Sequence, residues 1–523
     1  MGLFKSVQQG WNDFTPKERR EAAFYILGIV FYKFGLEAFN GSIITLATNR
    51  YDYDALRTQT PPKTFQRVGL MVGLNQACQC VGSILIAPLI RRYPARVILM
   101  VAMLVFGIFS AILLIMDACT AGTFVPVAFW PHHPENDFHY YGRYNTDSMI
   151  PIYCASGLSY GMVELIRRII PRDIVGGNLK RLRRLDALVH IFYEVFGTAG
   201  AFCTALVLIP HLGNNYSFLV TPVCFALAAL AWYFLGDQGF QAQKAETSDD
   251  QPPYVRAALT GGKLFLESIW VGAQIIFTTR KFIWLLPGYS IALYAHRYLE
   301  SAVMPALARR YLGNAAWSQI MVGGSNLGEL LGALFVIVLN NRVRTPIPWL
   351  RVDALMLLIT WYLPFWRPRL RHVLDALFAA ATFVPISFGW AAGDVSLAAY
   401  IQATLSRMES TSSNVSALGA VMAFLYSTYI VLYAVISPIL GSYIDQVYVE
   451  TGGSNGGGDI HGAIRNVASV QFTVISLLVL ISSFVPRGSL AVNPAVLDEE
   501  DLEEEDWGND VLSSGASMMS MIH

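Results

Sequence analysis

The sequence contains few charged residues. Of its 523 residues only 14% are Asp, Glu, Lys or Arg, against about 25% in an ordinary soluble domain, while 54% are hydrophobic and the mean hydropathy is +0.44. This composition excludes an ordinary water-soluble fold. Lys plus Arg and Asp plus Glu both number 37, so the formal net charge is zero and gives no reason to expect a nucleic acid as a partner.

Cysteine is also scarce. The six cysteines lie in or beside apolar runs, without His or acidic residues at the spacing of zinc ligands, so we interpret them as small core residues. A disulfide between Cys119 and Cys154, which flank one predicted loop, is the alternative. The loops contain no phosphate-binding loop or nucleophile triad. We therefore expect no metal, no cofactor and no enzymatic activity.

Long apolar runs dominate what is present. A helix of about 20 apolar residues crosses a hydrocarbon core of roughly 30 Å, and runs bounded by charge, Gly or Pro predict twelve such helices. The predicted spans are residues 22–46, 66–90, 95–118, 149–170, 186–209, 216–235, 282–306, 315–339, 348–366, 373–404, 415–444 and 464–485. The sequence thus predicts an all-α polytopic membrane protein with twelve transmembrane helices in two six-helix bundles.

The spans divide the chain into five parts. We expect a cytoplasmic amphipathic N-terminus over 1–21, an N-terminal bundle over 22–235, a cytoplasmic linker over 236–281, a C-terminal bundle over 282–487 and an acidic, disordered cytoplasmic tail over 488–523. The later part of the linker, Leu264 to Thr279, is apolar but short and contains Glu267. It is typical of an interfacial helix rather than a thirteenth span.

The positions of the basic residues predict the orientation. With both termini inside, the cytoplasmic segments hold 24 Lys and Arg and the outer loops hold 10, which is the bias that cytoplasmic loops show. We therefore predict cytoplasmic N- and C-termini, in the plasma membrane or the vacuolar membrane.

Ionisable residues within the spans are the best candidates for a functional site, because each costs about 2.5–3.5 kcal/mol to insert and needs a partner or water. Lys33 and Glu37 of the first span are four residues apart, so they share a helix face and can neutralise each other, with Asn40 further along. Two interpretations stay open: a charged wall of a substrate site, or a structural ion pair.

The seventh span contains His296, Arg297 and Glu300, and the fifth contains the similar pair His190 and Glu194. A His beside a carboxylate can take up and release a proton near neutral pH, as a proton-coupled carrier requires. We prefer the seventh-span cluster, because His190 lies near the end of its span, where it could anchor a loop instead.

Single acidic residues complete the candidate set. Glu164 precedes Arg167 and Arg168, which favours a local salt bridge. Glu329 follows a polar, glycine-rich run, in which the four-residue spacing of Gly324, Gly328 and Gly332 favours close helix packing over a helix broken around a ligand. Asp394 and Gln402, with neighbouring aromatic residues in the tenth span, suit a small organic ligand.

Corresponding loops of the two halves carry related residues. Gly82 is followed ten residues later by Arg92, and Gly332 ten residues later by Arg342. This resembles a degenerate form of the Gly-Asp-Arg-Gly-Arg signature of major facilitator superfamily transporters, with Arg91 at the acidic position and Pro94 at the second glycine. The resemblance, of a divergent fungal type, implies two bundles related by a pseudo-two-fold axis around a central cavity lined by spans one, four, seven and ten.

The sequence therefore predicts a secondary active transporter, a symporter or antiporter, that moves a small organic solute by alternating access, with protons as a possible coupling ion and the lipid bilayer as its surroundings. Charges of both signs occur in the spans, so the charge of the solute stays open. The alternatives are a non-transporting membrane scaffold or receptor and an intramembrane enzyme, which would need a nucleophile and a base facing one cavity.

Overall fold

The computed structural model describes residues 14–90, 92–130, 133–134, 136–175, 179–236, 252–339, 342–405, 415–453, 457–494 and 497. Most of the expected amphipathic N-terminus, the polar first part of the linker and the acidic run of the tail lie outside these residues.

All secondary structure in the described residues is helical, as predicted. The α-helices of the first half and the linker are α2 (Pro16–Thr58), α3 (Thr64–Ile90), α4 (Ala95–Cys119), α5 (Met149–Arg167), α6 (Ile170–Val175), α7 (Leu179–Cys203), α8 (Ile209–Tyr216), α9 (Val220–Tyr233) and α11 (Tyr254–Thr278). Those of the second half are α12 (Arg280–Ile283), α13 (Ala292–Tyr298), α14 (Met304–Arg310), α15 (Ser318–Leu339), α16 (Ile347–Leu357), α17 (Val373–Leu405), α18 (Ala417–Glu450), α19 (His461–Ile464) and α20 (Gln471–Ser482).

Short π-helical segments continue several of these helices. They are η3 (Thr204–Leu208), η5 (Leu286–Ile291), η6 (Leu299–Val303) and η10 (Arg465–Val470). The 3₁₀ segments are η1 (Val127–Phe129), η2 (Thr146–Ser148), η4 (Ser217–Leu219), η7 (Ala315–Trp317) and η8 (Leu358–Tyr362). A π-helical turn shifts the face that following residues present, which matters for the site below.

Local sequence sets the two ends of the first span. Thr15 caps α2: its hydroxyl accepts from the backbone N–H of Glu18, and the Glu18 carboxylate accepts from the Thr15 N–H at 2.7 Å. This reciprocal capping box, followed by Pro16 at the first helical position, starts the helix. Gln59, with φ of 53°, ends it in the left-handed conformation.

In the part of the chain that the structure describes, fewer helices have the length and apolar composition of a membrane span than the twelve that the sequence predicts. In the described residues nine helices are long and apolar enough to cross a membrane, or ten if the bent pair of α11 and Arg280–Arg310 counts as one span. That test treats Arg184–Tyr233 as one helix, whereas the sequence predicts two spans there. Gly213, with φ of 79°, breaks the helical path between them. The number twelve therefore stays a prediction.

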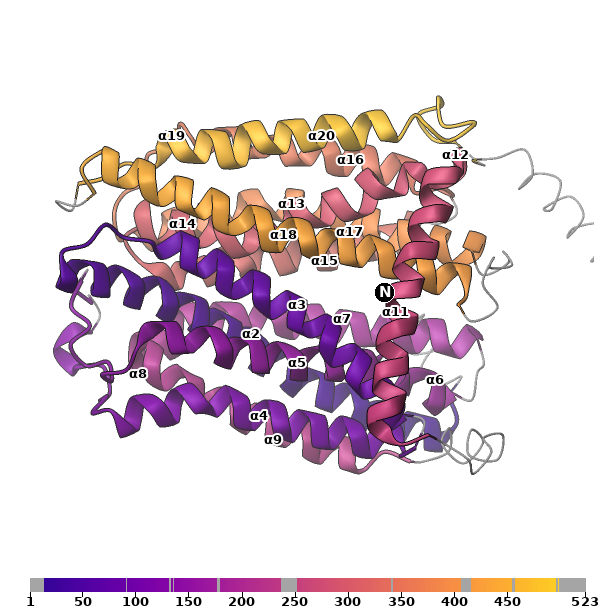
Figure 1. Cartoon of the computed structure of the whole chain (residues 1–523), viewed down its shortest axis with the longest axis horizontal. Helices are drawn as coiled ribbons and strands as arrows, with labels where there is room; N and C mark the ends of the chain where they lie inside the picture. The colour runs from indigo at the N-terminus through magenta and orange to yellow at the C-terminus, as the bar shows by residue number, and fades with distance from the viewer. Residues whose placement is uncertain are drawn as a thin grey trace, which may run out of the picture.

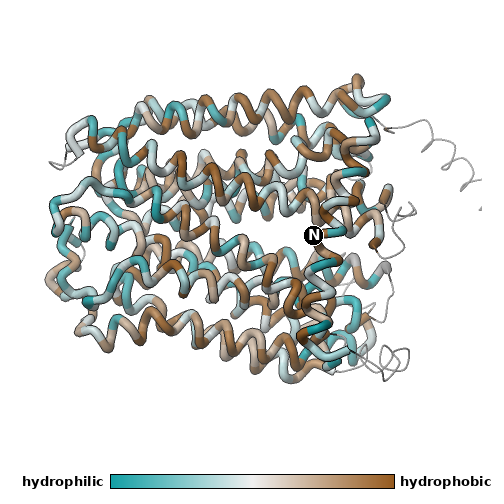
Figure 2. Tube along the Cα trace, in the orientation of Figure 1, coloured by the Kyte–Doolittle hydropathy of each residue, from teal (hydrophilic) through white to brown (hydrophobic). Residues whose placement is uncertain are grey.

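The helices form a parallel stack with two distinct ends (Figure 1). We call the end that holds α8, α14 and α19 the distal end, and the end that holds α6, α11 and α12 the proximal end. Hydrophilic residues gather toward both ends of the long helices (Figure 2). Large apolar side chains such as Ile108, Val338 and Ile439 are more than 60% exposed on the outside. This distribution suits a belt of lipid around a multi-pass membrane protein.

The apolar part of the linker forms a helix that crosses the stack. α11 begins at Tyr254, earlier than the sequence predicted, and it is bent by 110° from the segment that follows. Figure 1 shows it running across the proximal end, over helices of both halves. α11 contacts both halves: Tyr254 donates to the Leu85 carbonyl of α3 at 3.0 Å, and Gly272 packs on the Ala420 backbone of α18. This placement agrees with an interfacial helix.

Glycines allow closely packed helix pairs at matching positions of the two halves. A Cβ added to Gly324, Gly328 or Gly332 of α15 would lie within 2.4 Å of a backbone oxygen of α17. The predicted packing role is therefore confirmed, and α15 is unbroken. Gly82 of α3 meets the backbone of α5 in the same way, with the Leu158 oxygen 2.0 Å from the added Cβ. The glycines of the weak sequence repeat thus do the same work in both halves.

The interpretation of the cysteines as core residues holds for Cys224, which is buried, whereas Cys119 is exposed and the other four are half-buried. All six are free, and Cys119 and Cys154 form no disulfide.

Candidate functional site

The first charged pair of the site lies on α2. The Lys33 ammonium and a Glu37 carboxylate oxygen are 2.6 Å apart, and each residue is 7% exposed. The ion pair that the four-residue spacing predicts is therefore formed. Lys33 also lies 4.3 Å from the centre of the Tyr193 ring of α7, close enough for a cation–π contact.

The second charged pair faces it from the other half. The Arg297 guanidinium donates to a Glu300 carboxylate oxygen at 2.8 Å, and the hydroxyl of Ser325 on α15 donates to the other oxygen at 2.5 Å. Arg297 interacts electrostatically with Tyr160 of α5 and with Tyr429 of α18. Its position in the middle of a span therefore faces the interior of the protein rather than the lipid.

Solvent nevertheless reaches this position. The Arg297 side chain is 45% exposed, whereas that of its partner Glu300 is 12% exposed. A charged side chain in mid-span is tolerated where it lines a water-filled opening. The exposure of Arg297, among residues of both halves, marks such an opening between the two bundles.

His296 does not join the cluster that the sequence predicted for it. Its Nε2 lies 2.8 Å from a carboxylate oxygen of Asp353 on α16, and its ring stacks on Trp390 with the ring centres 5.0 Å apart. His296 is 4% exposed and Asp353 is fully buried. The pairing with Glu300 was wrong because the π-helical segment from Leu299 changes the four-residue spacing on which it depended, and because the Glu300 carboxylate accepts from Arg297 and Ser325 instead.

Asp353 is a partner that the sequence analysis missed. It is an acidic residue inside a predicted apolar span, so the same signal that singled out Asp394 could have found it. It is held within the second half, and it fixes the orientation of the imidazole.

The remaining candidates lie on α2 and α17. Asn40 is half-buried and its amide oxygen accepts from the Tyr153 hydroxyl of α5 at 3.2 Å. Asp394 is half-buried on α17 and interacts electrostatically with Arg168 and Arg297. Gln402 is exposed two turns further along α17, near its end at Leu405, so it lies apart from the charged pairs.

Glu329 lies on α15 opposite the first half. It is half-buried and interacts electrostatically with Glu194, Glu300, Arg297 and Lys33. Glu194 is the second residue that the candidate set lacked, because its spacing had paired it with His190. Its carboxylate interacts with the charges of both halves instead.

Glu164 is confirmed as part of a local salt bridge. Its carboxylate lies 2.6 Å from the Arg167 guanidinium and also accepts from the Tyr32 hydroxyl at 2.8 Å. The two charges neutralise each other within the first half, so this pair does not join the two halves.

Charged residues also join the two halves at the distal end. Asp52 of α2 accepts from Arg309 and Arg310 of α14 at 2.7 Å each, and the three side chains are 4%, 5% and 7% exposed. Asp445 of α18 accepts from the backbone N–H groups of Phe65 and Gln66 at 3.2 and 3.0 Å. The sequence analysis counted these arginines only as loop charges, so it missed this junction.

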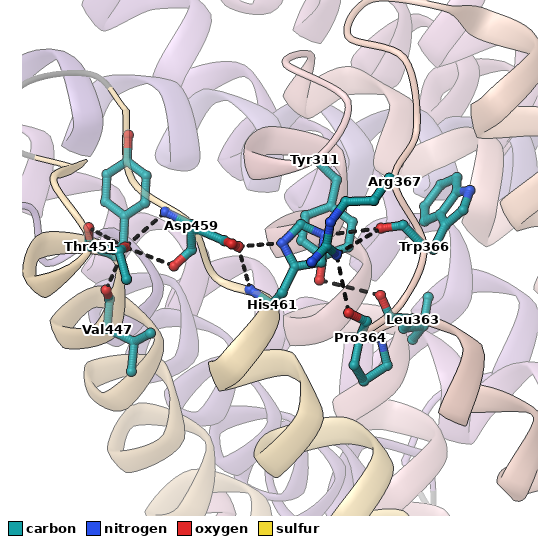
Figure 3. A network of polar contacts seen from close by, with 10 residues as sticks. Tyr311, Leu363, Pro364, Trp366, Arg367, Val447, Thr451, Asp459 and His461 are labelled. Atoms are coloured by element: carbon teal, nitrogen blue, oxygen red, sulfur yellow. Dashed lines mark hydrogen bonds and ion pairs between the residues drawn. The ribbon is translucent and has the colours of Figure 1, made fainter.

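A second polar network stiffens the distal end of the second half (Figure 3). His461 stacks on Tyr311, donates its backbone N–H to Asp459 at 2.8 Å, and lies with Nε2 2.9 Å from the Trp366 carbonyl oxygen. Thr451 bridges to the Asp459 backbone at 2.8 Å. The loops after α14, η8 and α18 are thereby tied together next to the end of α14.

Two transporters of known structure have a similar fold. The nucleoside transporter NupG aligns with a TM-score of 0.55 at 12% identity, over 88% of this chain and 98% of that one. The inward-open xylose transporter XylE from E. coli aligns with a TM-score of 0.56 at 11% identity, over 91% and 98%. The chain has the major facilitator fold. It is a multi-pass integral membrane protein.

Sequence comparison adds nothing to this. No protein-family model matches the chain, and no curated protein matches it by sequence. The major facilitator fold was predicted from twelve apolar runs and a weak repeat, and it is confirmed by structure alone.

Proposed function

We propose that this protein is a secondary active transporter that moves a small polar organic solute by alternating access. The observation that carries the proposal is the Arg297 side chain, 45% exposed in the middle of a span between two bundles. A charge in the middle of a span is costly to insert unless it faces a partner or a water-filled cavity, and such charges mark functional sites. In this fold an opening at mid-depth between two bundles is where a transported solute binds.

The closed distal end supports the proposal. The Asp52 junction joins the bundles there, whereas Arg168, near the proximal end of α5, is exposed. Rocking of the bundles would break the junction and bring the proximal ends together. We infer from the bias of basic residues that the proximal end faces the cytosol, so that the present state is open to the inside.

The residues around the opening indicate the chemistry of the solute. Lys33, Glu37, Arg297 and Glu300 offer charges of both signs already paired within their helices. Such pairs can exchange one partner for a hydroxyl, amide or charged group of a ligand without leaving a charge alone. A polar solute with several hydrogen-bonding groups fits better than an apolar one. Protons are the proposed coupling ion.

The test is untargeted mass spectrometry of cells and medium from a strain that lacks the gene. The strain is restored with the wild type, with Glu300→Gln, or with Glu450→Gln, which changes an exposed carboxylate at the end of α18. We expect a metabolite whose distribution the wild type and Glu450→Gln restore but Glu300→Gln does not. If the deletion changes no metabolite, the protein is a scaffold or receptor and the proposal fails.

A further inference from the structure

The charges around the opening do not balance. Two cations, Lys33 and Arg297, face four carboxylates that interact with one another electrostatically. Glu37 is taken by Lys33 and Glu300 by Arg297. Among the residues that the structure describes, the other two carboxylates, Glu194 and Glu329, have no ion-pair partner of their own.

Helix packing brings these two carboxyl groups to the same level. A Cβ on Gly197 of α7 would lie 3.2 Å from the Asn326 amide nitrogen of α15, and one on Gly323 would lie 2.8 Å from the Phe202 ring. The two helices therefore run antiparallel, and one step of three residues from Gly197 and Asn326 leads to Glu194 and Glu329. Residues three apart share a helix face, so Glu194 and Glu329 lie at the same level of the bundle interface, close enough to interact electrostatically.

Within the described part of the chain, several buried polar atoms at this place have no hydrogen-bond partner. Glu194 is 4% exposed and its Oε2 accepts no hydrogen bond, and Asn326 is 6% exposed with an amide nitrogen that donates none. The Nε2 of His190, one turn away on α7, is also unpartnered. Buried polar atoms nearly always have a hydrogen-bond partner. These atoms therefore indicate that a ligand or ion binds here.

The carboxyl groups of Glu194 and Glu329 are better suited to bind a proton than a metal ion. Two carboxylates that face each other in a site of low dielectric cannot both stay ionised, so they share a proton or bind a cation. A metal ion would need several ligands, and in the described part of the chain no three His, Cys, Asp or Glu side chains gather as a metal site requires. A proton needs only the two oxygens.

We propose that Glu194 and Glu329 together form the binding site of the coupling proton, one carboxyl group from each bundle. The proposal rests on the proposed transport function and names its coupling site. Because α7 and α15 belong to different bundles, the site is complete only when the bundles stand in the present register. Protonation then favours this conformation over one in which the two carboxyl groups part.

The charged and titratable neighbours set the affinity of the site. They are Lys33 and Glu37 of α2, Arg297 and Glu300 of the seventh span, and His190 and Tyr193 of α7 itself. The two cations favour the ionised carboxylates, and Glu37 and Glu300 oppose them. The proton can therefore leave once the carboxyl groups separate, because the charge of one carboxylate then no longer opposes ionisation of the other.

The experiment is infrared difference spectroscopy of the purified full-length protein during a pH titration. The readout is the C=O stretching band of a protonated carboxyl group and its shift in ²H₂O. We expect the band at neutral pH in the wild type and in Glu450→Gln, and its loss in both Glu194→Gln and Glu329→Gln. Each variant removes one half of the site, so a folding failure of one still leaves the other as a test.

Two results would overturn the inference: a band that persists in both Gln variants, or a wild-type band that Na⁺ abolishes at constant pH. The outcome is separable from that of the proposed function. Solute exchange that is indifferent to a pH gradient, with the band unchanged in the variants, leaves transport standing and removes the proton site. A band lost as expected, in a protein that moves no solute, leaves the proton site standing and removes transport.

Discussion

Removal of the negative charge of Asp52 is expected to open the distal end of the protein. In the present state Asp52 accepts from Arg309 and Arg310 at 2.7 Å, and Thr64 donates to it as well. Asp52→Asn keeps the size of the side chain but removes the carboxylate charge that both guanidinium groups, 5% and 7% exposed, contact in this state. Removal of one partner of a buried ion pair costs about 3–5 kcal/mol.

That cost falls on the closed state, because only there do the arginines lie against Asp52. When the bundles part at the distal end, all three groups become hydrated. Since 1.4 kcal/mol is a factor of ten, even the lower figure of about 3 kcal/mol changes the ratio of closed to open molecules by roughly 100-fold. A protein that is mainly closed would become mainly open.

Double electron–electron resonance spectroscopy between two spin labels measures this change in the ratio of closed to open molecules. In a background without the native cysteines, labels at Arg57 and Glu450 report on the distal ends of α2 and α18, where both side chains are exposed. We expect a longer distance to dominate in Asp52→Asn. The matched control is Asp54→Asn on the same helix, since Asp54 accepts from Thr146 of its own half. An unchanged distance distribution in Asp52→Asn, equal to that of the control, would refute the reasoning.

Three further predictions concern stability and pH. Gly328→Ala places a Cβ 2.3 Å from a backbone oxygen of α17 and should cost about 1–3 kcal/mol, seen as a lower melting temperature in detergent; Gly262→Ala, with open space around it, should cause no loss. Asp353→Asn weakens the buried contact with the Nε2 of His296, so we expect a loss of about 1–3 kcal/mol, measured as a lower melting temperature in detergent. Burial opposes the ionised form of Asp459, but hydrogen bonds from His461 outweigh it and hold the pKa of Asp459 below its usual 3.8; the distal network should therefore be stable above pH 4 and loosen as the pH falls through that lowered pKa. Hydrogen exchange at Thr451, Asp459 and His461 checks this, and Asp459→Asn should abolish the pH dependence.

Features that depend on one helix could be read from the sequence. The apolar runs place the helices, since lipid demands an apolar exterior and satisfied backbone groups. The ion pairs of Lys33 with Glu37 and of Arg297 with Glu300 follow from spacing alone. The π-helical segment after Tyr298 has no such signal, and so the predicted partner of His296 was wrong. Asp353 could be recognised as costly in its span, but not assigned to a histidine 57 residues away.

Contacts between the bundles could not be predicted from the sequence, for a different physical reason. Nothing in the sequence around Asp52 or Arg309 says which helices meet at the distal end, because that depends on how two independently folded bundles dock. The same holds for Glu194 and Glu329, whose level is set by the packing of Gly197 against α15. Single-sequence patterns report local geometry, and docking is not local.

This division has a consequence for the mechanism. Charges neutralised within one helix, such as Lys33 with Glu37, keep their partner when the bundles rock, so they contribute equally to both states and drive nothing. Charges that meet across the interface change their surroundings in every cycle. Only differential interactions can shift a conformational equilibrium, so Asp52 with its two arginines, and Glu194 with Glu329, are the groups whose substitution should change the balance of states, whereas loss of a pair within one helix should change solute binding instead.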